Sequence, residues 1–116
     1  MSQHYKIITS IAQKLEQSSI PYTFIEEAAL LLQGVNVSTD YLKVLVQWDV
    51  FSSCYDLFRE DERSEIEKTS IGASFFVRYE EMDIKISCLF NTTIKTDPYR
   101  INENDISCRS LYRYLY

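Results

Sequence analysis

Charged side chains stand on or beside three segments of the sequence that have the composition of β-strands. Four are carboxylates and two are lysines: Glu26, Glu27, Asp40 and Asp83, and Lys43 and Lys85. Carboxylate oxygens are the hard ligands that Mg²⁺ prefers, so the acids could form a metal site. The lysine ammonium groups repel a metal ion, and they could instead bind an anion or pair with the acids. The chemistry therefore depends on which of these side chains share one face of a sheet.

The thiols and the imidazole offer little chemistry of their own. Cys54, Cys88 and Cys108 are widely spaced and form no Cys-x-x-Cys pair. We expect free thiols, buried or half-buried, in a reducing cytoplasm. The single histidine, His4, lies near the N-terminus, so we predict no metal site built from cysteine and histidine.

Length and composition limit the class of protein. A chain of 116 residues that is 46% hydrophobic can bury one core, and we predict a single domain over residues 1–116. Its net charge of −5 and its scattered Lys and Arg argue against nucleic acid as a partner. Because we find neither an apolar run long enough for a bilayer nor the features of a signal peptide, we predict a cytoplasmic protein without a membrane partner.

Hydrophobic spacing predicts a mixture of helices and strands. The predicted helices cover residues 4–18, 26–33 and 49–60, with a last helical turn within 110–116. The predicted strands cover residues 22–25, 42–46, 73–79 and 82–90, with short edge strands at 99–101 and 105–108. The charge run 60–68 is interpreted as a solvated helix end and loop, and the short connection at Glu80-Glu81 predicts an antiparallel hairpin. This order predicts an α+β (mixed α/β) fold, a small twisted mixed sheet with helices mainly on one face.

Four short segments lie at offsets that together suggest a known family. They are Phe24-Ile25-Glu26-Glu27-Ala28, Leu32-Gln33-Gly34-Val35, Tyr41-Leu42-Lys43-Val44 and Met82-Asp83-Ile84-Lys85-Ile86. Their spacing resembles the minimal nucleotidyltransferase superfamily, most of all its small stand-alone bacterial members. In that family a strand ends in Gly-Ser and opens a helix, the next strand carries Asp-x-Asp, and a later strand carries a third carboxylate. The resemblance covers almost the whole chain and implies the fold of that family.

The resemblance also implies which chemistry is missing. The three carboxylates of the family hold divalent metal against a nucleoside triphosphate, and its Gly-Ser turn cradles the phosphates. Here Glu26 and Glu27 replace the turn, and Tyr41, Lys43 and Lys85 replace the carboxylates. A glutamate side chain blocks the approach of a phosphate, and a lysine repels Mg²⁺. The family positions are degenerate, so we predict no catalytic residue, no metal and no cofactor.

Two interpretations of function follow from these replacements. The first is a pseudoenzyme, a catalytically inactive nucleotidyltransferase-like domain that acts through protein contacts in a regulatory or interaction role. In this interpretation the acids and lysines pair across a closed pocket. The pairs would join Glu26 and Glu27 to Lys43 and Lys85.

The alternative is a nucleotide-binding protein or a nucleotidyltransferase with a rebuilt, non-standard site. In one version Lys43 and Lys85 bind an anion or nucleotide without metal. In the other, Mg²⁺ and nucleotide bind through substitute carboxylates, of which Asp40 and Asp83 are the candidates beside the two glutamates.

The C-terminal end offers a candidate partner surface. It is rich in tyrosine, and residues 112–116 alternate Tyr with Arg or Leu. Such a segment could pack on its own sheet, form an exposed contact surface or add a strand to a neighbour. We therefore consider a protein partner or a homodimer formed through this end.

Overall fold

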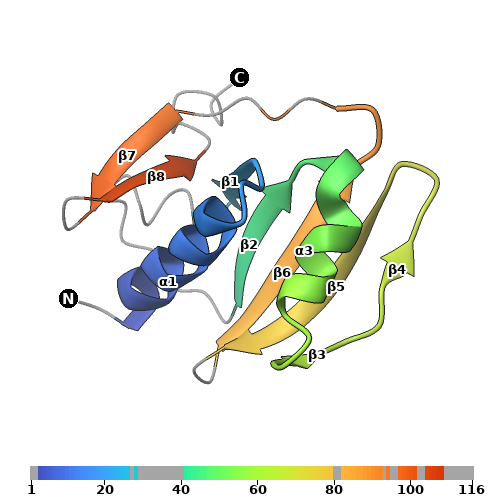
Figure 1. The fold of residues 1–116 in the computed structure, drawn as a ribbon, viewed down its shortest axis with the longest axis horizontal. Coiled ribbons are helices and arrows are strands. Elements are labelled where there is room, and N and C mark those ends of the chain that lie inside the picture. The colour runs from blue at the N-terminus through green and yellow to red at the C-terminus, as the bar shows by residue number, and fades with distance from the viewer. Residues whose placement is uncertain are drawn as a thin grey trace.

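The fold was analysed in a computed structural model, which describes residues 3–26, 28, 41–79, 82–92, 94, 97–101 and 104–108. Helix α1 (Gln3–Gln17) precedes the first strand, and a short 3-10 helix, η1 (Trp48–Val50), leads directly into helix α3 (Phe51–Leu57). Both helices lie across the same face of a twisted sheet (Figure 1). In the described part of the chain, no helix is long and apolar enough to cross a membrane.

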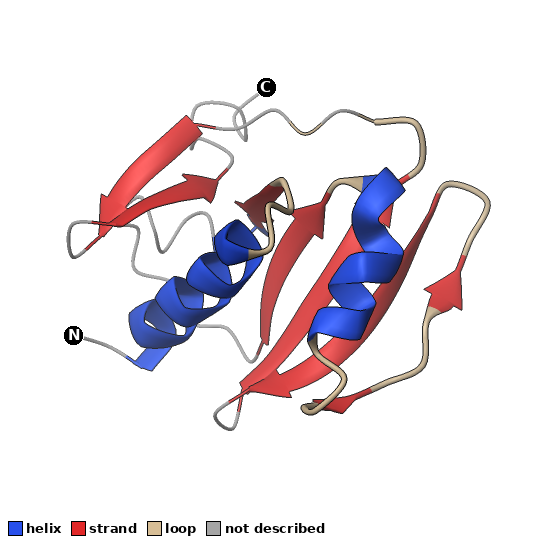
Figure 2. Cartoon of the chain, in the orientation of Figure 1, coloured by secondary structure: helices blue, strands red, loops and turns tan. Residues whose placement is uncertain are grey.

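The described strands form one mixed sheet in the order β3-β5-β6-β2-β1-β8-β7, and β4 also pairs with β5. The central strands are β1 (Tyr22–Ile25), β2 (Tyr41–Val46), β5 (Gly72–Tyr79) and β6 (Met82–Leu89). The others are β3 (Glu62–Arg63), β4 (Glu67–Lys68), β7 (Asp97–Ile101) and β8 (Asn104–Cys108). Figure 2 shows the strands behind the two helices, which confirms the predicted α+β fold with helices on one face.

The register of the central strands sets the neighbours of every side chain in the sheet. Strand β2 runs antiparallel to β1, with Ile25 opposite Lys43, and parallel to β6, with Lys43 opposite Lys85. Strands β5 and β6 form the predicted antiparallel hairpin, in which Phe76 lies opposite Lys85. These pairings place Ile25, Lys43, Lys85 and Phe76 in one row across four strands.

Helix α1 ends in a hydrogen-bonded C-terminal cap. Ile20 N–H donates to the carbonyl of Leu15 at 3.0 Å, and Ser19 N–H donates to that of Glu16 at 3.1 Å. Ser19 has a φ of 56°, so it takes the left-handed conformation that this type of cap requires. The cap turns the chain, and the buried side chain of Ile20 begins the path into β1.

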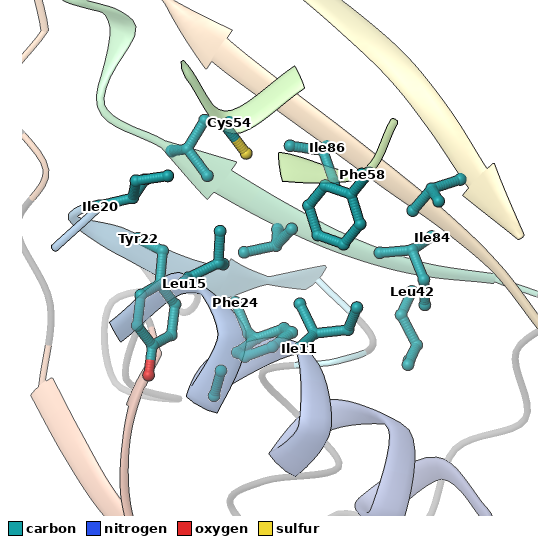
Figure 3. Close-up of a cluster of buried hydrophobic side chains, with 14 of the residues drawn as sticks. Ile11, Leu15, Ile20, Tyr22, Phe24, Leu42, Cys54, Phe58, Ile84 and Ile86 are labelled. Atoms are coloured by element: carbon teal, nitrogen blue, oxygen red, sulfur yellow. The ribbon is translucent and has the colours of Figure 1, made fainter. Parts of the chain in front are cut away.

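The core lies between the helices and the inner face of the sheet. Helix α1 buries one apolar stripe at helical spacing: Ile7, Ile8, Ile11 and Leu15. The sheet contributes alternate residues of its central strands, among them Phe24, Leu42, Val44, Ile84 and Ile86. Figure 3 shows Ile11 and Leu15 beside Phe24. Each fully buried side chain of this size contributes about 1.5–3 kcal/mol, so this layer is the main source of stability.

Helix α3 packs through an aromatic group centred on Phe75 of β5. The ring of Phe75 meets Tyr55 edge-on at a centroid distance of 4.8 Å and Phe51 at 5.6 Å. Phe58, just beyond the helix, lies 6.3 Å away. Lys14 Nζ lies 5.0 Å from the Phe58 ring and 3.4 Å from the Asp61 carboxylate, so α1 also contacts this end of α3.

Two of the three cysteines are free thiols inside the core, as predicted. Cys54 and Cys88 are both buried and unpaired. Burial raises the pKa of the Cys54 thiol to about 12, with a smaller contribution from Cys88, and burial also raises the pKa of Cys88. Since the thiolate is the reactive form, both groups are inert at neutral pH.

Three predicted elements differ from the structure. The helix predicted over 49–60 begins as the 3-10 helix η1 and ends at Leu57. The charge run 60–68 is not simply a helix end and loop, because it contains β3 and β4, which pair with β5. The predicted strand 105–108 is not an edge strand, since β8 lies between β1 and β7.

Long-range contacts explain why the charge run contains β3. The Arg63 guanidinium lies 3.7 Å from the centre of the Tyr55 ring and donates to the Tyr55 carbonyl. Ser64 N–H donates to the carbonyl of Phe76 at 2.8 Å. These contacts hold a polar segment in the sheet, although its local sequence has no strand periodicity.

The predicted helix 26–33, apart from Glu26 and Ala28, and the predicted turn within 110–116 lie outside the described residues.

Candidate functional site

The charged residues of β2 and β6 point away from the helices. Leu42 and Val44 are buried on the inner face, so Tyr41 and Lys43 project from the opposite face of β2. On β6 the buried Ile84 and Ile86 likewise alternate with outward residues. We call this side of the sheet the outer face and define it by six residues: Tyr41, Lys43, Phe76, Arg78, Asp83 and Lys85.

Parallel pairing of β2 with β6 brings two cations together on the outer face. Lys43 and Lys85 are register partners. Tyr41 and Asp83 are also partners, two residues earlier along the two strands. Side chains at paired positions of adjacent strands point to the same face of a sheet and lie close together. The register therefore places both lysines on the outer face.

Glu26 forms an ion pair with Lys43 at the end of β1. Glu26 Oε2 lies 2.6 Å from Lys43 Nζ, and the two side chains are 43% and 20% exposed. The hydrogen bond to Glu26 raises the pKa of Lys43, against the opposing effect of burial, and the charge of Glu26 adds to the rise. The ion pair predicted for these acids and lysines is thus present between Glu26 and Lys43.

The backbone of Glu26 has a conformation that usually belongs to glycine. Its φ is 54°, which places a residue with a Cβ atom in the left-handed region. That conformation costs roughly 1–2 kcal/mol for an ordinary L-residue. Glu26 directly follows β1, so the chain turns sharply at the point where this strand ends.

An aromatic ring lies near each of the two lysines. Lys43 Nζ lies 5.5 Å from the centre of the Tyr41 ring, and Lys85 Nζ lies 5.9 Å from that of Phe76. The Tyr41 and Phe76 rings meet edge-to-face at a centroid distance of 6.3 Å. The two distances from lysine Nζ to ring centre are within the range of cation–π attraction, so each ammonium group is stabilised by a ring. Tyr41 and Phe76 remain 37% and 41% exposed, which makes them available to a binding partner.

A shallow hollow lies at the far side of this aromatic group. Its volume is about 280 Å³, and its wall includes Phe76, Arg78 and Asp83 together with Arg63 and its neighbours on the β3 side. Arg78 Nη1 lies 3.4 Å from Asp83 Oδ1, and both side chains are about half exposed. The carboxylate of Asp83 is therefore already engaged by a cation.

The residues of the outer face do not fit a Mg²⁺ site. A magnesium ion requires oxygen ligands at close to octahedral positions. Two neighbouring ammonium groups, Lys43 and Lys85, repel a dication, while Glu26 and Asp83 are each paired with a cation. Among the described residues, no group of three or more His, Cys, Asp or Glu side chains could hold a metal ion.

The structure brings together most of the site residues predicted from the sequence. Tyr41, Lys43, Asp83 and Lys85 share the outer face, and Glu26 contacts Lys43. Glu27 and Asp40 lie outside the described residues.

Sequence reasoning missed the contribution of β5 to this face. Phe76 and Arg78 contact Lys85 and Asp83, respectively, and neither was singled out in the sequence. The hairpin prediction contained the necessary signal. Only two residues separate β5 from β6, so Tyr79 pairs with Met82, Arg78 with Asp83 and Phe76 with Lys85.

Solved structures share this architecture over nearly the whole chain. TM1012 of Thermotoga maritima, a proposed nucleotidyltransferase, superposes with a TM-score of 0.76 over 97% of this chain and 81% of its own, at 14% identity. The chain has a nucleotidyltransferase-like fold. ANT(2″)-Ia in complex with adenylyl-2″-tobramycin gives a TM-score of 0.68 over 94% of this chain and 70% of its own, at 10% identity. No protein-family model and no curated protein matches the sequence.

This likeness confirms the sequence resemblance at the level of fold. At 14% and 10% identity, similar structures show how the chain is folded and not what it does. The function of the nucleotidyltransferase-like fold in this chain must be argued from the outer face itself.

The positive φ of Glu26 predicts that glycine at this position gives a more stable protein than alanine, the reverse of their order in an ordinary helix. Glu26→Ala and Glu26→Gly both remove the carboxylate, but only glycine adopts the left-handed conformation without cost. We expect Glu26→Gly to be more stable than Glu26→Ala by about 1 kcal/mol in urea denaturation. In an ordinary helix alanine would be the more stable of the two, so that order would contradict the turn described here.

The raised pKa of Lys43 predicts a coupling with Glu26 that depends on pH. A folded-state pKa above the ordinary value of 10.5 means that the stabilisation is complete below 10.5 and is lost as the pH rises through the folded value. A double-mutant cycle of Glu26→Gln and Lys43→Met should give a coupling of up to about 1 kcal/mol at neutral pH, since the pair is partly exposed. The coupling should approach zero well above pH 10.5. An equal coupling at both pH values would show that it does not arise from the charged pair.

Proposed function

We propose that this chain is a nucleotidyltransferase-like protein without nucleotidyl-transfer activity, and that it acts through protein contacts. In this proposal the five positions Glu26, Glu27, Tyr41, Lys43 and Lys85 are the degenerate equivalents of the family's phosphate turn and metal carboxylates. The observation that carries the proposal is the placement of Lys43 and Lys85 at paired positions, with Lys43 bound to Glu26 at 2.6 Å.

The positive φ of Glu26 supports this assignment of positions. A strand that ends in a glycine-like turn before a helix is what a Gly-Ser phosphate turn needs, because a glycine lets backbone N–H groups approach a phosphate. Here the turn carries a carboxylate whose charge opposes a phosphate and whose side chain binds Lys43. In this proposal the turn keeps a glycine-like backbone, while its carboxylate repels a phosphate.

A role in protein contacts agrees with the composition of the outer face. Tyr41 and Phe76 are exposed aromatic residues, and Arg78 lies beside them. Aromatic residues and arginine are enriched at protein interfaces and contribute most of the energy at their centres. An exposed face with these residues suits a macromolecular partner.

A second candidate is binding of an anion or nucleotide without metal. Lys85 favours it, because within the described part of the chain Lys85 contacts the Phe76 ring and takes part in none of the ion pairs. A phosphate group could accept hydrogen bonds from Lys85 while a base stacks on an exposed aromatic ring. The carboxylate of Glu26 opposes this candidate, which is why we place it second.

Thermal unfolding with nucleotides separates the two candidates and tests for the rebuilt metal site. We expect ATP, GTP, CTP and UTP, each with and without Mg²⁺, to leave Tm unchanged, because the carboxylates of Glu26 and Asp83 are each already paired with a cation. A Mg²⁺-dependent rise in Tm that is lost in Asp83→Ala would contradict the proposal and support a rebuilt catalytic site.

The same experiment identifies anion binding by its own pattern. A rise in Tm that does not require Mg²⁺ and is lost in Lys43→Ala and Lys85→Ala would favour the second candidate. Arg78→Ala is the matched control, since it removes a cation from the same face but leaves both lysines in place.

A further inference from the structure

Lys43 and Lys85 border one aromatic pair on the outer face. Lys43 Nζ lies 5.5 Å from the centre of the Tyr41 ring, Lys85 Nζ lies 5.9 Å from that of Phe76, and the two rings contact each other. The lysines are also register partners in β2 and β6. Because side chains at partner positions project from the same face with their Cβ atoms about 5 Å apart, both ammonium groups serve the same small area of the sheet.

The acids of the outer face do not balance this pair of lysines. Glu26 Oε2 lies 2.6 Å from Lys43 Nζ, whereas Lys85 takes part in none of the ion pairs of the described residues. The nearest acid along β6, Asp83, is paired with Arg78. Two ammonium groups and one carboxylate therefore leave one positive charge without an acidic partner in the described part of the chain.

The Glu26 carboxylate occupies Lys43 in the way that an oxyanion from solution would. An ammonium group donates charge-assisted hydrogen bonds to carboxylate and to phosphate oxygens alike, and distances below 3 Å are typical of both. Lys85 stands at the neighbouring position with its own donors. The arrangement thus corresponds to an oxyanion site in which a side chain of the same molecule takes the first position.

The contact between Glu26 and Lys43 is one that an anion could displace. The two side chains are 43% and 20% exposed, and ion pairs that are open to water contribute little to stability. Glu26 is, however, attached to the chain directly after β1, so its carboxylate stays at high effective concentration beside Lys43. An anion from solution must compete with this tethered carboxylate and is also repelled by its charge.

We propose that Lys43 and Lys85 form a latent site for a phosphate-like oxyanion, and that Glu26 is its built-in competitor. Glu26 weakens binding in two ways, because it occupies Lys43 and because it places a negative charge beside the incoming anion. Glu26 is therefore the residue that determines specificity at this face, where it excludes phosphate groups. The inference rests on the proposed function, in which the wild-type chain binds no metal–nucleotide complex.

Titration of ¹⁵N-labelled protein with inorganic phosphate, in EDTA and at constant ionic strength, tests the proposal. In Glu26→Gln, which keeps the size of the side chain and removes its charge, the amide signals of Lys43 and Lys85 should show saturable shifts. We expect a dissociation constant at least about tenfold lower than that of the wild type, since the competitor and its repulsion are both removed.

Asp56→Asn is the matched control for net charge. It removes the same charge at an exposed position of α3, which lies across the opposite face of the sheet. This variant should respond to phosphate as the wild type does. Adding Lys85→Met to Glu26→Gln should abolish the gain, because one of the two ammonium groups of the site is then missing.

Four outcomes would overturn the proposal. They are no phosphate binding by Glu26→Gln, equal binding by the wild type and Glu26→Gln, an equal gain in Asp56→Asn, and a gain that persists when Lys85→Met is added. If Glu26→Gln does not fold, Glu26→Gly repeats the test, since glycine adopts the positive φ of this position without cost.

Failure of the proposed function would give a different result. A Mg²⁺-dependent response of the wild-type chain to ATP would contradict the proposed function. If neither the wild type with Mg²⁺ and ATP nor Glu26→Gln with phosphate responds, the proposed function stands and only the role of Glu26 as a competitor is contradicted.

Discussion

The parallel pairing of β2 with β6 is the constraint on which the chemistry of the outer face depends. It places Lys43 and Lys85 at partner positions, where two ammonium groups must be stabilised side by side. Different contacts stabilise the two groups. Lys43 binds Glu26 and contacts the Tyr41 ring, and Lys85 contacts the Phe76 ring. The ring contact between Tyr41 and Phe76 then joins the two halves of the cluster. The resulting face is internally compensated, and a divalent cation would have to displace these interactions to bind.

Much of this arrangement could be predicted from the sequence, because its determinants are local. The apolar spacing in α1, the alternation in β2 and β6 and the two-residue connection between β5 and β6 fix those elements and the faces of their side chains. The offsets between the four segments that resemble the nucleotidyltransferase family were sufficient to predict the fold. The strand β3 could not be predicted, since Arg63 and Ser64 hold it through contacts with Tyr55 and Phe76. The glycine-like φ of Glu26 could not be predicted either, because nothing in a glutamate indicates it.

The backbone and the side chains of this fold give different information about function. The left-handed turn at Glu26 and the parallel β2–β6 pair are backbone features that accompany a nucleotidyltransferase-like fold here. The side chains at the same places are a carboxylate and two lysines, which oppose phosphate and Mg²⁺, respectively. Tyr41 and Phe76 are exposed on the outer face, where they are suited to contacts with other molecules. These side chains are the basis of our proposal that the fold serves association and not metal-dependent transfer.

Paramagnetic broadening tests this account most directly. Mn²⁺ takes the place of Mg²⁺ at oxygen-ligand sites and broadens the NMR signals of nearby amides. In ¹⁵N-labelled protein, we predict that MnCl₂ with ATP leaves the amides of Ile25, Glu26, Lys43 and Lys85 as intense as those of α1. Selective loss of these signals, reversed by EDTA, would show that a metal–nucleotide complex binds the outer face and would contradict the account.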